Sequence, residues 1–134
     1  MSLNNSALLR QDNAQNRVTR AGANAKWQLR GGTRPVGSGA VTGANPLYAT
    51  LIAGATIGTA TNGALDIDEA GLTQVVANHV SGTPTFIDLT TSADVLVSRA
   101  DIGAGTGNMQ ISGPVVTGQL VSFVAPATIT EGNV

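Results

Sequence analysis

The sequence predicts an all-β domain, an antiparallel sandwich or barrel-like body preceded by an extended or short-helical N-terminal arm. From Lys26 onward, short apolar or alternating segments recur, and turn-forming sequences such as NP, NG, GTP and SGP separate them. Seven or eight short strands at a spacing of about ten residues are typical of sandwiches and barrels. After Gly22, no segment shows the apolar period of a helix.

The arm comprises residues 1–25, and the β domain comprises residues 26–134. The arm is polar and rich in Asn and Gln. Ser2 is a suitable N-cap for a short helix, and Gly22 is a suitable residue to end it. The apolar positions of this helix would be Leu3, Ala7, Leu8, Ala14 and Val18.

The β domain divides into segments of strand length. In chain order the predicted strands are KWQLR (26–30), LYATLIA (47–53), ALDI (64–67), TQVVANHV (73–80), PTFIDL (84–89), DVLVSRADI (94–102), NMQIS (108–112) and GQLVSFVAPATIT (118–130). KWQLR alternates, which places Trp27 and Leu29 on one side of its strand. The predicted core includes Trp27, Leu29, Leu51, Val75, Phe86, Ile87, Leu96, Ile111, Val121 and Phe123.

The composition is low in charge and in aromatic residues. Of the 134 residues, 11% are charged and 3% are aromatic, so the core must be built from Val, Ile, Leu and Ala. These side chains bury less area than aromatic ones, so we expect neighbouring copies to contribute burial. The absence of cysteine excludes disulfides and thiolate metal sites. No stretch approaches the roughly 18 consecutive apolar residues of a membrane-spanning helix.

The charges are segregated along the chain. Residues 1–34 carry six Lys or Arg against one Asp, whereas residues 35–134 carry one Arg against seven acidic residues. This asymmetry predicts a basic arm and an acidic body. The candidate docking partners of the arm are the acidic body of a neighbouring copy, another acidic protein and nucleic acid, and the alternative is a solvated, partly disordered terminus. Specific reading of single-stranded nucleic acid is not expected, because the arm lacks interleaved aromatic residues. The predicted contact residues are Leu3, Leu8, Leu9, Arg10, Arg17, Val18 and Arg20.

The glycine-rich loop GGTRPVGSGAVTG (31–43) has the spacing of a phosphate-binding loop but not its chemistry. Gly32 and Gly37 are followed by Ser38 and Gly39, where Lys and then Ser or Thr would be needed. The loop leads into another predicted strand, so no helix N-terminus is available for a phosphate. It is predicted to connect two strands.

Two other candidate sites carry only part of a known pattern. DIDEAG (66–71) resembles the start of a calcium-binding loop, but two of the ligand positions of such a loop hold alanine in this sequence. We therefore interpret Asp66 and Asp68 as part of an acidic turn. The alternative is a weak calcium site at these two residues. His79 is the only histidine and is predicted to be structural, on an outward-facing strand position. We therefore expect no catalytic residues, no resident metal and no cofactor.

Four segments resemble a family of small β-rich virion proteins of tailed bacteriophages. They are LRGGTRPVG (29–37), LYATLIAG (47–54), SGTPTFIDL (81–89) and NMQISGPVVTGQLVSFVAPATITEGN (108–133). The family has a short N-terminal segment and a T-G-T-R-P-like loop after the first strand. The Asn-rich, Arg-bearing arm departs from that pattern. The family offers no catalytic residues.

The resemblance implies a structural role in the phage particle, made in the host cytoplasm. The leading expectation is a capsid decoration or cement protein that forms homo-oligomers, most simply trimers, and binds the major capsid protein. The alternative is a tail adaptor, collar or fibre-base protein. A carbohydrate-binding module is a third possibility, for which only Trp27 and Tyr48 would be candidate stacking residues.

Overall fold

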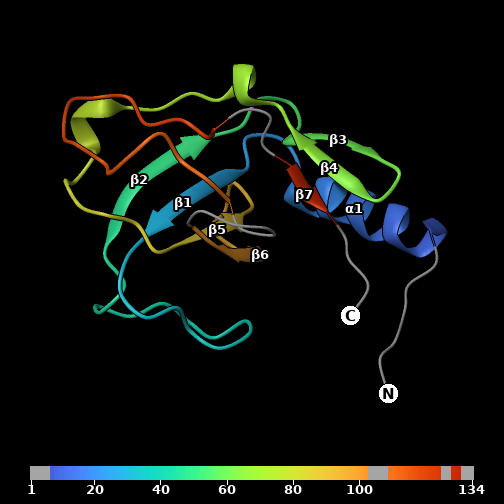
Figure 1. The fold of residues 1–134 in the computed structure, drawn as a ribbon, viewed down its shortest axis with the longest axis horizontal. Helices are drawn as coiled ribbons and strands as arrows, with labels where there is room; N and C mark the ends of the chain where they lie inside the picture. Colours follow the sequence, from blue (N-terminus) through green and yellow to red (C-terminus); the bar gives the residue numbers. More distant parts are fainter. Residues whose placement is uncertain (1–6, 103–108, 125–127, 131–134) are drawn as a thin grey trace.

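The computed structural model describes residues 7–102, 109–124 and 128–130 (Figure 1). Two antiparallel sheets carry the fold, with strand orders β2-β1-β5-β6 and β3-β4-β7. Short 3-10 helices lie at Glu69–Gly71 and Val76–Asn78. The longer elements are α1 (Ala7–Ala21), β1 (Lys26–Arg30), β2 (Leu47–Ile52), β3 (Gly58–Thr61), β4 (Ala64–Ile67), β5 (Phe86–Thr90), β6 (Leu96–Asp101) and β7 (Thr128–Thr130).

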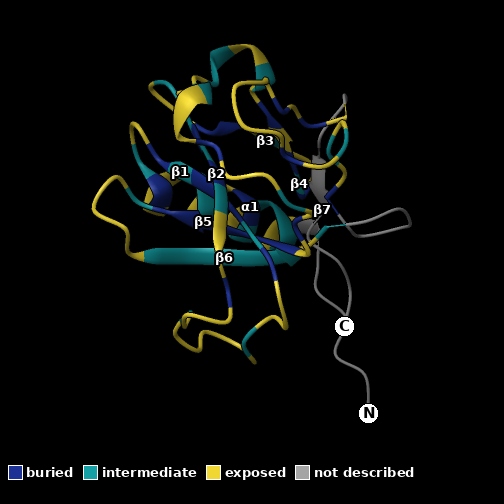
Figure 2. Cartoon of the chain, turned by 90° about the vertical axis from the view of Figure 1, so that its left-hand side faces the viewer, coloured by how far each residue is buried: buried dark blue, intermediate teal, exposed yellow. Residues whose placement is uncertain are grey.

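The predominantly β, antiparallel fold is confirmed. Neither sheet closes on itself in the described part of the chain, so a sandwich or barrel is not shown. Figure 2 shows that the central strands β1 and β5 are largely buried, whereas the edge strand β6 is half-buried. Among the described residues, no helix has both the length and the apolar character needed to cross a membrane.

The main core lies on one face of the four-stranded sheet. As its alternation predicts, Trp27 shares this face with Leu29, and the cross-strand partners of Trp27 are Leu51 on β2 and Leu89 on β5. The segment 109–124 covers this face and contributes Phe123, whose ring meets that of Trp27 edge-on at 5.6 Å between centroids. Such an edge-to-face pair stabilises a core beyond the area that it buries.

The N-terminal helix packs on strands of its own chain. Gly22 ends α1 in the left-handed conformation, with φ of 70°, and its N–H donates to the carbonyl of Val18. Ala14 and Ala21 are fully or almost fully buried. Gln11 binds the turn between β3 and β4, because its Nε2 donates to Ala60 O (3.0 Å) and its Oε1 accepts from Gly63 N (2.9 Å).

The predicted strand at residues 73–80 is wrong. Its residues form a 3-10 turn at Val76–Asn78, and Val75, predicted in the core, is 58% exposed. The physical reason is that side chains replace the strand ladder here. The amide of Gln74 both donates to Val121 O (2.9 Å) and accepts from Val121 N (3.0 Å).

The C-terminal strand predictions are only partly correct. In place of strands at 108–112 and 118–124, the described residues form isolated bridges such as that between Ile111 and Phe123. Strand β7 covers only 128–130, and residues 108 and 125–127 lie outside the described part. Of the predicted core, Leu96 and Ile111 are half-buried, while Trp27, Leu29, Leu51, Phe86, Ile87, Val121 and Phe123 are buried.

Candidate functional site

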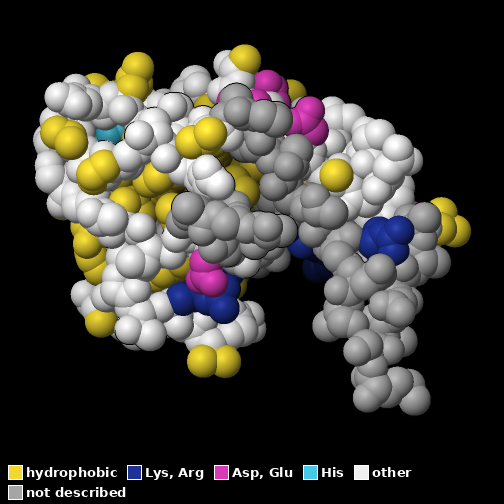
Figure 3. All heavy atoms as spheres, in the orientation of Figure 1, with side chains coloured by type: hydrophobic (Ala, Val, Ile, Leu, Met, Phe, Trp, Pro, Cys, Tyr) yellow, Lys and Arg dark blue, Asp and Glu magenta, His cyan; other side chains and the backbone are white. Residues whose placement is uncertain are grey.

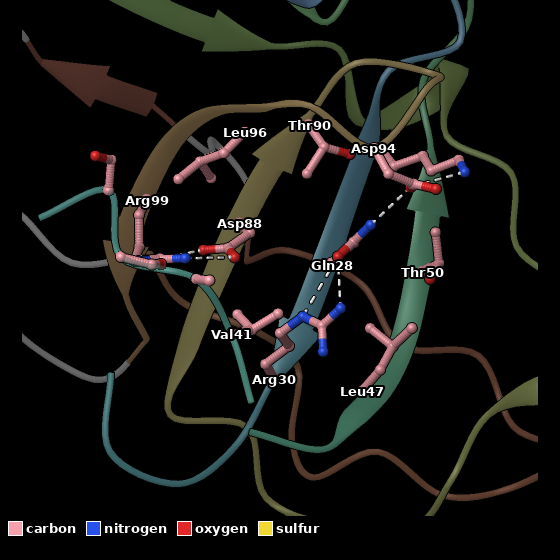
Figure 4. Close-up of a pocket in the computed structure, with 14 residues that line it drawn as sticks. Gln28, Arg30, Val41, Leu47, Thr50, Asp88, Thr90, Asp94, Leu96 and Arg99 are labelled. Carbon is pink, nitrogen blue, oxygen red and sulfur yellow. Dashed lines mark hydrogen bonds and ion pairs between the residues drawn. The ribbon is translucent and has the colours of Figure 1, made fainter. Parts of the chain in front are cut away.

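A cavity of about 570 Å³ lies on the face of the four-stranded sheet opposite the core (Figure 4). Strand alternation directs polar side chains to this face, since Lys26, Gln28 and Arg30 alternate with the core residues of β1. Strands β5 and β6 add Asp88 and Arg99. The glycine-rich loop, through residues 38–41, lines the other side.

Arg99 and Asp88 form a buried, bidentate ion pair in this cavity. Nε of Arg99 lies 2.6 Å from Oδ1 of Asp88, and Nη2 lies 3.0 Å from Oδ2. The two side chains are only 6% and 5% exposed. The hydrogen bond to Asp88 raises the pKa of Arg99 above its ordinary value, and this effect outweighs the lowering by burial.

The same guanidinium fixes the glycine-rich loop over the sheet. Nη1 of Arg99 donates to the carbonyls of Gly37 (3.1 Å) and Gly39 (2.9 Å). The base of the loop is closed by buried Asn45, which donates to Gly31 O (3.1 Å) and Thr33 O (2.8 Å). The loop runs from β1 into β2, so the predicted strand connection is confirmed and no helix N-terminus follows it.

The side chain of Gln28 on β1 lies between the carboxylate of Asp94 and the guanidinium of Arg30 and bonds to both. Its Nε2 donates to Oδ1 of Asp94 (3.1 Å), and its Oε1 accepts from Nε (3.3 Å) and Nη2 (3.0 Å) of Arg30. If the amide of Gln28 were flipped, its NH2 group would face the N–H donors of Arg30 and its oxygen would face the carboxylate of Asp94. Arg30 and Asp94 therefore determine the orientation of this amide. Asp94 also accepts from Nζ of Lys26 at 2.9 Å.

Arg30 is the one cation of the cavity wall that no carboxylate of the described residues neutralises. Its third hydrogen bond runs from Nη1 to the carbonyl of Asn45 (3.0 Å), so its acceptors among the described residues, Gln28 Oε1 and Asn45 O, are both neutral. Lys26 and Arg99, by contrast, each have an acidic partner. The wall therefore carries one positive charge that is not paired with a carboxylate of the described residues.

The described residues among those predicted for arm docking lie elsewhere, on α1. Leu8 and Leu9 are 72% and 45% exposed, whereas Val18 packs against the core. Arg10 and Arg17 are half-buried, Arg20 is exposed, and Leu3 lies outside the described residues. Because α1 contacts β3 and β4 of its own chain, part of the arm's apolar surface is already covered. Docking on a neighbouring copy remains a prediction.

The two candidate sites near Asp68 and His79 are explained by local structure. Asp68 caps the first 3-10 helix by accepting from Gly71 N (3.2 Å), and the described residues contain no His, Asp and Glu cluster suited to a metal ion. The outward position predicted for His79 is wrong, because the ring is 4% exposed. Its Nδ1 lies 3.0 Å from the carbonyl of Gln119.

Sequence reasoning missed the residues of the cavity. Gln28, Asp88 and Asp94 belong to no motif. Strand pairing brings Gln28 and Asp88 together, and Asp94 lies in the turn between β5 and β6. The available signal was the alternation of KWQLR and FIDLT, whose polar members all fall on the face opposite the core. That pattern predicts a polar face, but it does not predict that a loop encloses it.

Comparison of the chain with protein-family models gives no match, and comparisons with curated proteins and with solved structures give none either. The resemblance to virion proteins therefore remains an expectation from the quoted segments.

Proposed function

We propose that the protein is a structural component of a tailed-bacteriophage particle, a decoration or cement protein whose copies associate and bind the capsid lattice. The observation that supports this proposal is an uncharged, apolar surface made by two adjacent segments. We call it the uncharged face and define it as the exposed surface of residues 72–82 and 109–124.

The two segments of the uncharged face are joined by backbone hydrogen bonds. Gly82 and Val115 exchange two of them, with N–O distances of 3.0 and 2.8 Å. Further along, Gly118 N donates to Val76 O at 2.9 Å. The sequence has no charged residue from 70 to 87 or from 102 to 130, so neither segment carries a charge.

Large apolar side chains gather on this face. The upper left of Figure 3 shows hydrophobic side chains and a histidine, with no Lys, Arg, Asp or Glu among them. Apolar surface of this kind on a protein is typical of contacts with other proteins. The exposed residues, with their exposed fractions, are Val75 (58%), Val80 (53%), Val116 (41%), Leu120 (75%) and Val124 (46%).

The partner that fits the uncharged face is a second copy of the same chain. A charged partner surface would lose hydration against this face without gaining an ion pair. A second copy offers an equally uncharged surface, and in a symmetric assembly the same residues are available on every subunit. The apolar contact is expected to persist at high salt, whereas docking through the arginines of the arm would weaken.

A carbohydrate-binding role is not favoured by the positions of the four aromatic residues. Trp27, Phe86 and Phe123 are buried. Tyr48 packs between two glycines, since a Cβ on Gly31 would lie 2.6 Å from its Cε2 and a Cβ on Gly82 would also meet the ring. Stacking on a sugar requires an exposed aromatic face, and none of these four rings offers one.

The experiment for the proposed function is quantitative gel densitometry of purified particles. A decoration protein is expected on the order of hundreds of copies per particle, because it follows the symmetry of the lattice. A copy number of about a dozen or fewer would instead support the tail adaptor, collar or fibre-base role. Absence of the protein from particles would contradict both.

A further inference from the structure

Within the described ranges of the chain, the sheet cavity has one cation, Arg30, with no carboxylate partner and with N–H groups left over. A guanidinium has five N–H donors. Three bonds from Arg30 are accounted for, from Nε and Nη2 to Gln28 and from Nη1 to Asn45, so one N–H on each Nη atom remains available. We propose that this cavity is a binding site for a monovalent carboxylate, held by Arg30.

The charges of the wall favour a single negative charge on the ligand. The cavity is lined by three cations, Lys26, Arg30 and Arg99, and by two carboxylates, Asp88 and Asp94. Arg99 is fully engaged with Asp88, and Lys26 with Asp94, which leaves one positive charge. A doubly charged anion would exceed this charge and would lie near both carboxylates.

The neighbours of Arg30 favour a carboxylate on a short aliphatic stem. Leu47 is the register partner of Arg30 on β2, and Figure 4 shows Val41 on the other side of the guanidinium. A carboxylate matches the donor geometry of a guanidinium, and aliphatic carbon packs favourably against Val and Leu. Such a ligand is either a free organic acid or the side chain of a glutamate in a protein. This site is separate from the uncharged face, and the inference does not depend on the proposed function.

The test is an NMR titration of the full chain that follows the Nε–H signals of its arginines. Sodium butyrate is the probe, butyramide is its uncharged counterpart, and sodium chloride controls for ionic strength. We expect butyrate to shift the signal of Arg30 saturably and to leave that of Arg34 unchanged. Arg34 is an exposed arginine paired with Asp101, outside the cavity lining. Butyramide and chloride are expected to cause no saturable shift.

Matched variants test the role of Arg30. Arg30→Gln should weaken butyrate binding at least about tenfold, since charge-assisted hydrogen bonds are lost. Arg34→Gln removes the same charge from outside the cavity and should change the affinity less than about twofold. Arg30→Lys keeps the charge, so it should retain part of the binding and separates loss of binding from loss of folding.

A second arm of the titration distinguishes the two sources of the carboxylate. A short blocked peptide with one Glu is compared with its Gln counterpart. Tighter binding of the Glu peptide than of butyrate indicates a carboxylate from a protein, whereas binding of butyrate alone indicates a free acid. The proposal is overturned if neither probe shifts Arg30, if butyramide acts like butyrate, or if Arg30→Gln binds as the wild type does.

Discussion

Arg99 on β6 and Asp88 on β5 are register partners, and their side chains form two parallel hydrogen bonds in an almost fully buried position. The same arginine holds the glycine-rich loop through two carbonyls and lies over the ring of Phe86, 5.5 Å from its centroid. This one contact therefore joins two strands, a long loop and the wall of the cavity.

Removal of the acidic partner should be strongly destabilising. Asp88→Ala leaves Arg99 buried without its counter-charge, which is expected to lower the free energy of unfolding by about 3–5 kcal/mol. Asp94→Asn is the control, because Asp94 pairs with Lys26 in a side-chain position that is 61% exposed, and its loss should cost less than about 1 kcal/mol. Urea denaturation measures both. If both substitutions lowered the free energy of unfolding equally, the buried ion pair would contribute no more to stability than the exposed one.

The arginine of this pair should add no pH dependence to stability in mildly alkaline solution. Its folded-state pKa is raised above the ordinary value by the hydrogen bond to Asp88. A group with a raised pKa contributes its full stabilisation below the unfolded-state pKa, and it loses that contribution only as the pH rises through the folded-state pKa. For an arginine this loss falls in strongly alkaline solution. A loss of the Arg99–Asp88 contact near pH 9, followed by the Nε–H signal of Arg99, would contradict this account.

Phe86 is the largest apolar side chain on the cavity side of β5, and it is fully buried. Phe86→Ala should cost about 3–5 kcal/mol of the free energy of unfolding, because it removes a buried ring and leaves a void beneath Arg99. Val36 is 94% exposed, so Val36→Ala should change stability by less than about 0.5 kcal/mol. Calorimetric melts of the two variants should differ accordingly; near-identical melts would mean that the Phe86 ring is not part of the packed interior.

The hydrogen bonds of Gln11 should anchor the N-terminal helix to the β3–β4 turn. Gln11→Ala leaves Gly63 N–H and Ala60 C=O without their partner and should cost about 1–3 kcal/mol. The amide of Gly63 should exchange its hydrogen faster in this variant. Gln15, exposed on the same helix, provides the control substitution Gln15→Ala. Unchanged exchange at Gly63 in Gln11→Ala would argue against this contact.

His79 should carry its proton on Nδ1, because the atom that it meets is a carbonyl oxygen, which can only accept. Nitrogen NMR of the ring measures the tautomer directly. His79→Ala leaves Gln119 O without this donor and should destabilise the fold by about 1–3 kcal/mol. Asn78→Ala, at the exposed neighbouring position, should be nearly neutral. An Nε2-protonated ring would show that the hydrogen bond to Gln119 is not formed.

The sequence predicts those elements whose signal is local. KWQLR alternates over a whole strand, ALDI follows an Asn-Gly turn, and Gly22 ends a helix, so all three were correctly placed. Strand β3 was missed because GTAT (58–61) has no large apolar residue and is defined only by its pairing with β4.

The remaining elements depend on contacts that the sequence does not display. TQVVANHV has the composition of a strand, but the side chain of Gln74 takes the place of a ladder partner for Val121. The cavity combines residues of four strands, the glycine-rich loop and the β5–β6 turn. Arg30 is left without a carboxylate among the described residues because Asp94 and Asp88 are engaged by Lys26 and Arg99. Which carboxylate pairs with which cation depends on the tertiary structure, so no sequence motif predicts it.

The central claim, that copies of this chain associate through the uncharged face, is tested most directly by sedimentation velocity of the wild type and Leu120→Asp. Leu120 is 75% exposed on this face, and a carboxylate there would be buried without a partner on association. The account predicts an oligomer for the wild type, a monomer for Leu120→Asp, and an oligomer for the control Val36→Asp, whose site lies in the glycine-rich loop. A monomeric wild type, or an oligomer that Leu120→Asp leaves intact, would contradict it.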